Sequence, residues 1–218
     1  MRRRAYEDEL EALNRDILRM GSMVEDAVRA SVEALAVQDL YQAQTVIDND
    51  PVIDGLELGV EQRCVNLLAL QQPMAKDLRL VATAISIVTN LERMGDHAVN
   101  ISEVTMRIGN RPLIKPLIDI PRMAALSQDM IRGSLDAFVS RDAELARATC
   151  RKDDDVDATY EALFDELVGF IITSRDESVS TQAVNLLFVA RFLERIADHA
   201  TNIGERVIYM VTGRRETY

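Results

Sequence analysis

The sequence predicts an all-α protein made of two tandem three-helix bundles related by internal duplication. Three observations lead to this fold class. Apolar residues recur at helical spacing along most of the chain. The phrase "LERMGDHAVNISE" at 91–103 returns as "LERIADHATNIGE" at 193–205, which is 102 residues later. Gly and three Pro gather in "GNRPLIKPLIDIP" at 109–121, so no helix is expected to cross that segment.

The composition also favours packed helices and narrows the function. Of the 218 residues, 48% are hydrophobic and only 5% are aromatic, with no Trp. A core of aliphatic side chains and Met suits helices better than a β-sandwich. The net charge of −11 argues against a general nucleic-acid binder, because phosphate contacts need clustered Lys and Arg. An acidic surface can hold cations or meet a basic protein surface.

No targeting or membrane segment is predicted. The opening "MRRR" is followed by "AYEDELEAL" and not by the apolar stretch of a signal peptide. No stretch approaches the ~18 uninterrupted apolar residues of a membrane span. Cys64 and Cys150 fit no metal or redox spacing, so we interpret them as small buried hydrophobic residues in a reducing compartment. We therefore expect a cytoplasmic protein without membrane insertion.

Three helical segments are expected in the first half. The first carries an apolar stripe at steps of three and four residues, made of Leu10, Leu13, Ile17, Met20, Val24, Val28, Ser31 and Leu35. The second spans about 40–70, and Pro51 should kink or restart it just after Asp50. The third spans about 73–108. Pro73 lies near its start with Asp77 in its first turns, which indicates helix initiation or, alternatively, a loop that touches a partner.

Three more helical segments are expected in the second half, at about 122–140, 142–173 and 179–212. Gly213 stands where a glycine C-cap would end the last of them. No segment alternates apolar and polar residues between turn signals, so no sheet is predicted. We expect a first three-helix bundle at 1–110, a linker at 111–121 and a second bundle at 122–218.

The repeated phrase builds a helix with an apolar back and a front of acids and amides. At about 100° per residue from Glu92, Asp96 falls near 40° and Asn100 near 80°, opposite the apolar residues of the phrase. Eight of the twelve positions from 92 to 103 are identical in the second copy. The corresponding front residues there are Glu194, Asp198, Asn202 and Glu205.

A second acidic stripe is predicted on the middle helix of each half. By the same arithmetic, the members of each stripe lie within about 60° of one another. These members are Asp50, Asp54, Glu57 and Glu61 in the first half, and Asp153, Asp157 and Glu161 in the second. Carboxylates one turn apart repel each other, and a hard cation would turn that repulsion into ligation.

An alternative interpretation leaves the stripes without metal. Acidic helix faces are often solvated, and Arg93, Arg107 and Arg195 are close enough in sequence to neutralise them through i,i+3 and i,i+4 pairs. His97 and His199 fall near 140°, at the boundary between the two faces. We interpret both as hydrogen-bonded packing residues rather than ligands.

Three phrases carry a family resemblance. "QQPMAKDLRLV", "NLERMGDHAVNI" and "FLERIADHATNI", in a two-by-three helical plan, resemble the PhoU family of bacterial phosphate-uptake regulators over nearly the whole chain. The resemblance implies a cytoplasmic, commonly dimeric protein associated with the phosphate ABC transporter ATPase and with the sensor histidine kinase of the phosphate-starvation response. Such proteins restrain transport and keep the response off when phosphate is plentiful.

The resemblance also implies metal ions bound by acid-x-x-x-Asp motifs on the bundle faces. The metal could be iron, zinc, magnesium or manganese. The candidate ligands are Glu92, Asp96, Asn100, Glu194, Asp198, Asn202, Asp50, Asp54, Asp153 and Asp157. Pro51, inside the first middle-helix motif, departs from the expected pattern.

Three functions stay open from the sequence. The leading hypothesis is a non-enzymatic adaptor whose acidic faces dock partners. The second is a carboxylate-bridged metalloenzyme, an oxidase or phosphatase, in a helical bundle. Ferritin-like di-metal sites use Glu-x-x-His, whereas Glu92 and His97 stand five residues apart. The third is a purely structural bundle that pairs with other helices.

Overall fold

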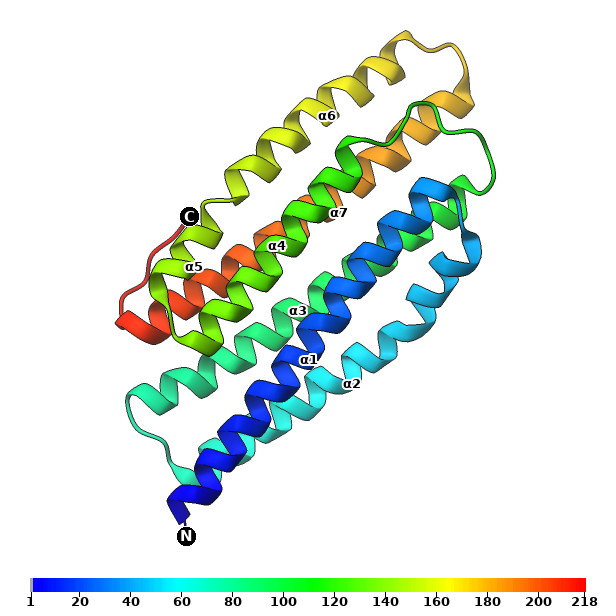
Figure 1. Cartoon of the computed structure of the whole chain (residues 1–218). Coiled ribbons are helices and arrows are strands. Elements are labelled where there is room, and N and C mark those ends of the chain that lie inside the picture. The colour runs from blue at the N-terminus through cyan, green and yellow to red at the C-terminus, as the bar shows by residue number, and fades with distance from the viewer. Residues whose placement is uncertain (1) are drawn as a thin grey trace.

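The computed structural model describes residues 2–218, and their side chains from Tyr6 onward. This part of the chain forms seven helices and no strand (Figure 1). They are α1 (Arg2–Val37), α2 (Leu40–Gln71), α3 (Lys76–Ile108), α4 (Asp119–Ser140), α5 (Ala143–Cys150), α6 (Asp153–Thr173) and α7 (Glu177–Thr212). None of these helices combines the length and hydrophobicity needed to cross a membrane. The predicted all-α fold class is confirmed.

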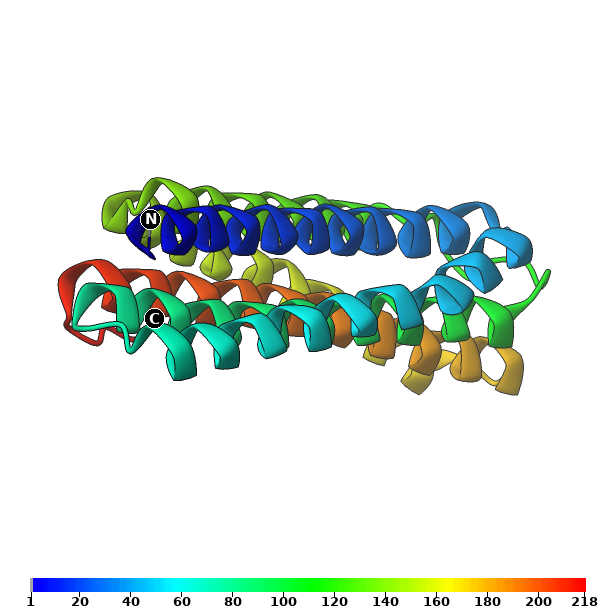
Figure 2. The same cartoon turned by 90° about the horizontal axis from the view of Figure 1, so that it is seen from below.

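The two halves lie side by side as elongated bundles. Helices α1, α2 and α3 form the first bundle, and α4, α7 and the broken pair α5–α6 form the second. The bundles meet where α3 packs against α7 and α1 packs against α4. Figure 2 shows α1 and α4 in one layer, with α3 and α7 in the other. Each last helix is therefore covered by both of its own bundle partners and by the other half.

One continuous hydrophobic core joins the halves. The apolar back of the repeated phrase supplies its centre, where Met94 and Ile101 of α3 and Ile196 and Ile203 of α7 are fully buried. The predicted stripe of α1 is also confirmed, since all its apolar members from Leu13 onward are buried. Burying one such large side chain contributes about 1.5–3 kcal/mol before conformational entropy is counted. The shared core fixes how the acidic fronts of the two phrases are presented.

The middle helices differ from the prediction. Helix α2 continues through Pro51, so the expected restart is wrong. Proline removes one backbone donor from the helix, but Pro51 is exposed, and buried Val46 and Ile53 anchor the turns on either side.

The segment expected as one helix at 142–173 instead divides into α5 and α6. Asp142 caps α5 by accepting hydrogen bonds from the backbone N–H groups of Glu144 and Leu145. Three consecutive acids from Asp153 occupy the first turn of α6, where the helix dipole favours negative charge. The sequence thus carries two helix starts. The break between them, at Arg151 and Lys152, corresponds to Asp48 and Asn49 of α2, just before Asp50.

The linker between α3 and α4 is shorter than expected, and side chains of both halves hold its first part. Helix α4 begins at Asp119, and Pro121 fits its first turn because backbone N–H groups there have no helical partner. The buried Gln182 amide donates to Pro112 O at 3.0 Å, and Gln38 donates to Gly109 O at 2.8 Å. The division into two independent domains stays a prediction.

The predicted helix signals at two other places are confirmed. Helix α3 begins just after Pro73, with Asp77 in its first turn. Gly213 ends α7 in the left-handed conformation, at φ 73°. Cys64 and Cys150 are both buried and free, as expected for small hydrophobic residues.

Gly204 lets α5 lie directly against α7. A Cβ atom at this position would stand 2.5 Å from the Cys150 sulfur and 3.4 Å from the carbonyl oxygen of Ala146. The first distance is too short for any real contact, and the second atom belongs to the backbone. Close packing of the two helices therefore requires glycine.

We predict that Gly204→Val lowers the free energy of unfolding by roughly 2 kcal/mol, because the added methyl groups overpack the α5–α7 contact. Urea denaturation followed by circular dichroism at 222 nm measures the change. Replacing Cys150 with Ala in the same chain should restore part of the loss.

Gly59→Val is the matched control, since Gly59 is a helical glycine of α2 with nothing within 4 Å of its added Cβ. This variant should be unchanged or slightly more stable, because valine favours a helix over glycine. Equal stability of the two variants would refute the close approach.

Candidate functional site

The first acidic cluster lies between α2 and α3. We use this name for Asp50, Asp54, Glu57, Glu92 and Asp96. The two stripes face each other across the helix pair, because the charge of Asp96 acts on Asp50 and the charge of Asp54 acts on Asp96. Gly95 lets α2 come close, since a Cβ there would stand 3.4 Å from Asp50 Oδ1.

The second acidic cluster lies between α6 and α7. It consists of Asp153, Asp157, Glu194 and Asp198. The charge of Asp198 acts on both Asp153 and Asp157, so these two helices bring their stripes together in the same way. The two clusters occupy equivalent places in the duplicated fold.

Burial and mutual repulsion disfavour the charged forms of these acids. Burial, followed by the charges of Asp54 and Asp96, raises the pKa of Asp50 to about 6. Burial, followed by the charges of Asp157 and Asp198, raises the pKa of Asp153 to about 6. A cation placed among the carboxylates would remove the repulsion and favour the ionised forms.

Among the described side chains, three buried carboxylate oxygens lack hydrogen bonds: Oδ1 of Asp153, Oε2 of Glu92 and Oε2 of Glu194. The last two occupy the same position in the two copies of the phrase. Burial is the main cause that raises the pKa of both side chains. The two glutamate oxygens still face arginines, with Arg93 Nε 3.3 Å from Glu92 Oε2 and Arg195 Nε 4.0 Å from Glu194 Oε2. A buried carboxylate oxygen without a hydrogen bond is costly, so a ligand there would compete only with that ion pair.

Arginines partly neutralise both clusters, as the metal-free interpretation expects. Arg93 lies 3.3 Å from Glu92 and 3.5 Å from Asp96, and Arg195 lies 3.4 Å from Asp198. Arg191 also pairs with Glu194. The more exposed pairs, those of Asp96 and Asp198, typically contribute less than about 1 kcal/mol each. Arg107, in contrast, is exposed in the last turn of α3.

The predicted ligands are thus brought together only in part. Eight of the ten predicted ligands belong to the two acidic clusters, four between α2 and α3 and four between α6 and α7. Asn100 is half-buried and Asn202 is exposed, one turn further along. Among the side chains that the structure describes, no three His, Cys, Asp or Glu residues lie close enough to hold one ion as they stand. Metal ligation therefore stays a prediction.

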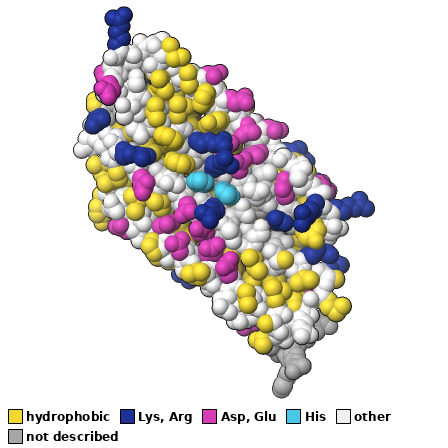
Figure 3. Space-filling model, turned by 180° about the vertical axis from the view of Figure 1, so that it is seen from behind, with side chains coloured by type: hydrophobic (Ala, Val, Ile, Leu, Met, Phe, Trp, Pro, Cys, Tyr) yellow, Lys and Arg dark blue, Asp and Glu magenta, His cyan; other side chains and the backbone are white. Residues whose placement is uncertain are grey.

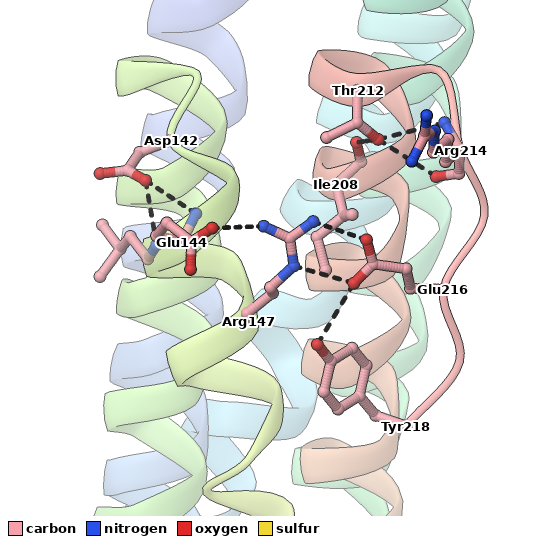
Figure 4. Close-up of polar contacts among 9 residues, drawn as sticks. Asp142, Glu144, Arg147, Ile208, Thr212, Arg214, Glu216 and Tyr218 are labelled. Atoms are coloured by element: carbon pink, nitrogen blue, oxygen red, sulfur yellow. Dashed lines mark hydrogen bonds and ion pairs between the residues drawn. The ribbon is translucent and has the colours of Figure 1, made fainter.

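The chain end folds back along α7, where Glu216 meets Arg147 of α5 (Figure 4). It also contacts Glu205, which the repeated phrase places on the same front. The backbone N–H of Tyr218 donates to Glu205 at 2.9 Å. Glu216 accepts a hydrogen bond from Arg147 Nε at 2.8 Å and joins this segment to α5. Glu205 therefore belongs to a structural contact of the chain end rather than to the second acidic cluster.

The two histidines meet at the centre of the α3–α7 contact, where Figure 3 shows them side by side among charged side chains. Their ring centroids are 5.7 Å apart. His199 Nδ1 lies 2.9 Å from Asn90 Oδ1, as expected for a packing histidine. His97 instead stacks on Phe192 at 5.7 Å, and its buried Nδ1 has no hydrogen-bond partner.

The duplication explains this difference. Asn90 and Phe192 each stand seven residues before their own histidine, so each lies beside the histidine of the other half. Only the asparagine offers an oxygen. Burial, then the charges of His199, Arg195 and Arg93, lower the pKa of His97 to about 4. Sequence reasoning missed this pair, although the substitution of Asn90 by Phe192 stands at the first position of the aligned phrases, one residue before Leu91 and Leu193.

The fold and the two acidic clusters define a duplicated helical protein with paired acidic faces. Comparison with known proteins identifies its family. The model of the PhoU domain matches residues 17–105 and 120–207, one match in each half. The chain therefore belongs to the PhoU family.

Individual relatives agree over nearly the full length. A phosphate-specific transport system accessory protein PhoU homolog of Clostridium acetobutylicum is 41% identical over 99% of this chain and 98% of its own. The Aquifex aeolicus homolog of the same name is 39% identical, over 94% of this chain and 92% of its own. The crystal structure of PhoU from Pseudomonas aeruginosa superposes with a TM-score of 0.90 at 34% identity, covering 96% of this chain and 100% of that one.

These relatives are named as accessory proteins rather than enzymes, in agreement with the prediction of a non-enzymatic protein. None of the names supports the carboxylate-bridged metalloenzyme.

We predict that Asp50→Asn stabilises the chelator-treated protein at pH 7 by about 1 kcal/mol, because an amide removes a buried, repelled charge. The folded pKa of Asp50 is about 6, above the ordinary 3.8, so the folded state binds the proton more tightly. Acidification from pH 6 toward 3.8 therefore favours folding, and the advantage of the asparagine variant should shrink over that interval.

Thermal unfolding at several pH values measures this effect, and Asp48→Asn is the control, because Asp48 is an exposed acid of the same helix. An advantage of Asp50→Asn that stays constant from pH 7 to pH 4 would contradict the buried, coupled carboxylate.

Proposed function

We propose that this chain is an accessory regulator of phosphate uptake, acting as an adaptor between the phosphate ABC transporter ATPase and a phosphate-sensing histidine kinase. The observation that carries the proposal is the full-length 41% identity to a protein named as a phosphate-specific transport system accessory protein. The family resemblance further supports a cytoplasmic homodimer. An adaptor needs docking surfaces rather than a catalytic centre, and two rigid bundles provide several.

We also propose that the acidic clusters bind cations, of which iron, zinc, magnesium and manganese are candidates. Two observations support a ligand there: the stripes face each other across each helix pair, and buried oxygens of Glu92 and Glu194 lack hydrogen bonds. Carboxylates must rotate away from their arginine partners to meet one ion, so binding competes with those weak pairs. Asp50, Asp54, Glu92 and Asp96 would hold the cation in the first half.

In the second half, Asp153, Asp157, Glu194 and Asp198 would hold it. Asn100 and Asn202 would extend the two sites. A bound cation would neutralise the repulsion and present positive charge that an anionic group can contact.

Metal content tests the cation proposal. We expect near-stoichiometric metal in untagged protein purified from cells, measured by mass spectrometry, and its loss in an Asp96→Ala/Asp198→Ala double variant that keeps its helicity.

The matched control is Asp26→Ala/Asp129→Ala, which removes two exposed acids that pair with arginines three residues away, as Asp96 and Asp198 do. This control should retain the metal. Negligible metal in the wild type, or equal metal in all three proteins, would reject the cation sites and leave the adaptor proposal standing.

Capture of partners tests the adaptor proposal. The tagged chain should retain the transporter ATPase or the histidine kinase from cells, with an amount that changes between phosphate-rich and phosphate-starved growth. If neither the transporter ATPase nor the histidine kinase is retained under either growth condition, the proposal is refuted.

A further inference from the structure

The phenylalanines of this chain all lie in the second half, and two of them are exposed on its surface. The chain has five Phe residues, and only Phe138 lies in the core. Phe164 on α6 is 42% exposed and Phe188 on α7 is 51% exposed, while Phe170 and Phe192 are half-buried. Phe170 and Phe192 still pack against the core, and Phe192 stacks on His97. Phe164 and Phe188, in contrast, leave much of their rings exposed.

Two apolar stripes form this surface, each with members at i, i+4 and i+8. Phe164, Val168 and Ile172 follow α6, and Val184, Phe188 and Phe192 follow α7. We call these six residues the α6–α7 patch. Figure 3 shows hydrophobic side chains gathered on this face, at the end of the molecule away from the N-terminal residues. Each stripe is about 12 Å long, or two helical turns.

One contact sets the register of the two stripes. The Arg191 guanidinium of α7 lies over the Tyr160 ring of α6, 5.9 Å from its centroid. Because α6 and α7 run antiparallel and pack together, Phe164 then stands level with Phe188, one turn further on. Tyr160 and Phe164 are in ring contact at 6.1 Å, as are Phe188 and Phe192 at 6.3 Å. The stripes are therefore parallel walls of one shallow surface.

The first half shows that the fold does not require this surface. Corresponding residues of the two halves are 103 positions apart in the middle helix, as Asp50 and Asp153 are, and 102 positions apart in the last helix. Phe164 therefore corresponds to Glu61, and Phe188 corresponds to Ser86. The same bundle is thus built with polar residues at these positions. Exposed aromatic side chains that folding does not need are typical of protein-binding surfaces.

An acidic rim defines the chemistry of the occupant. Asp157, Glu161 and Asp165 are exposed along α6 beside the patch. Glu161 and Asp165 line an open hollow together with Tyr160 and Phe164. A segment that fits must offer apolar anchors at helical spacing flanked by Lys or Arg. A second copy of this chain fits poorly, because its net charge is −11.

We propose that the α6–α7 patch docks a basic amphipathic helix of a partner protein. The proposal names the partner chemistry for the adaptor function above and rests on that function. The apolar face of the helix lies across Phe164 and Phe188, and its basic flank lies along the acidic rim. The aromatic side chains supply most of the affinity, and the acids select a basic partner over an acidic one.

A peptide titration on the full chain tests this directly, without any cellular partner. The probe is a fluorescent 14-residue helix of Leu and Lys with Leu on one face, followed by anisotropy. Two comparison peptides carry Glu in place of Lys, or the same Leu and Lys in an order that destroys the apolar face. We expect micromolar binding of the first peptide only.

Phe188→Ser installs the residue of the first half and should weaken binding at least tenfold. The matched control is Val65→Ser, which removes an apolar residue that is similarly exposed, at 52%, on α2 of the first half. It should bind as the wild type does. Circular dichroism and thermal unfolding confirm that both variants are folded, and Phe164→Glu provides a second variant of the patch with the residue of the first half.

Three results would overturn the proposal. One is that the first peptide fails to bind the wild type, and another is that it binds Phe188→Ser as tightly as the wild type. The third is that the peptide whose order destroys the apolar face binds the wild type as tightly as the first peptide does. A concentration-dependent dimer that Phe188→Ser abolishes, without peptide binding, would assign the patch to a second copy and overturn it too. Capture of the transporter ATPase or the kinase is measured separately. Loss of the adaptor function therefore remains distinguishable from loss of this docking surface.

Discussion

The packing of α3 against α7 determines where every other feature of the molecule lies. Each of these helices carries one copy of the repeated phrase, and the apolar backs of both copies are fully buried in a common core. Helices α1 and α2 pack on α3, while α4, α5 and α6 pack on α7. The acidic fronts must then point to the seams with α2 and α6, and the two histidines must meet at the centre.

The two halves share the same helix packing but carry different residues at several equivalent surface positions. The acids that face each other across α2–α3 recur across α6–α7, and Glu92 and Glu194 lack hydrogen bonds at the same oxygen. In contrast, Asn90 and Phe192 give equivalent histidines different neighbours. Glu61 and Phe164 give equivalent helices different surfaces. The shared features support a common ligand in both halves, and the differences support separate partners.

The sequence was sufficient for the fold class and for the helix faces, because both follow from periodicity within single helices. The places of Asp54 and Asp96 in their acidic stripes followed from the same arithmetic, but the facing of the two stripes depends on how α2 packs on α3. The break before Asp153 was not predicted, and the restart expected at Pro51 inside the predicted 40–70 segment is absent, since both depend on capping and tertiary anchoring. The raised pKa of Asp50 and the unpartnered nitrogen of His97 arise only when separate helices meet. Ligand sets depend on side-chain rotamers, which sequence spacing does not specify.

Native-state hydrogen exchange of the full chain tests the shared α3–α7 core most directly. Amides around Met94 in α3 and around Ile196 in α7 should exchange through one global opening, with the same free energy and the same urea dependence. Exchange from one half at a free energy several kcal/mol lower, while the other half stays protected, would contradict the account. The halves would then be independent bundles in contact rather than parts of one cooperative core.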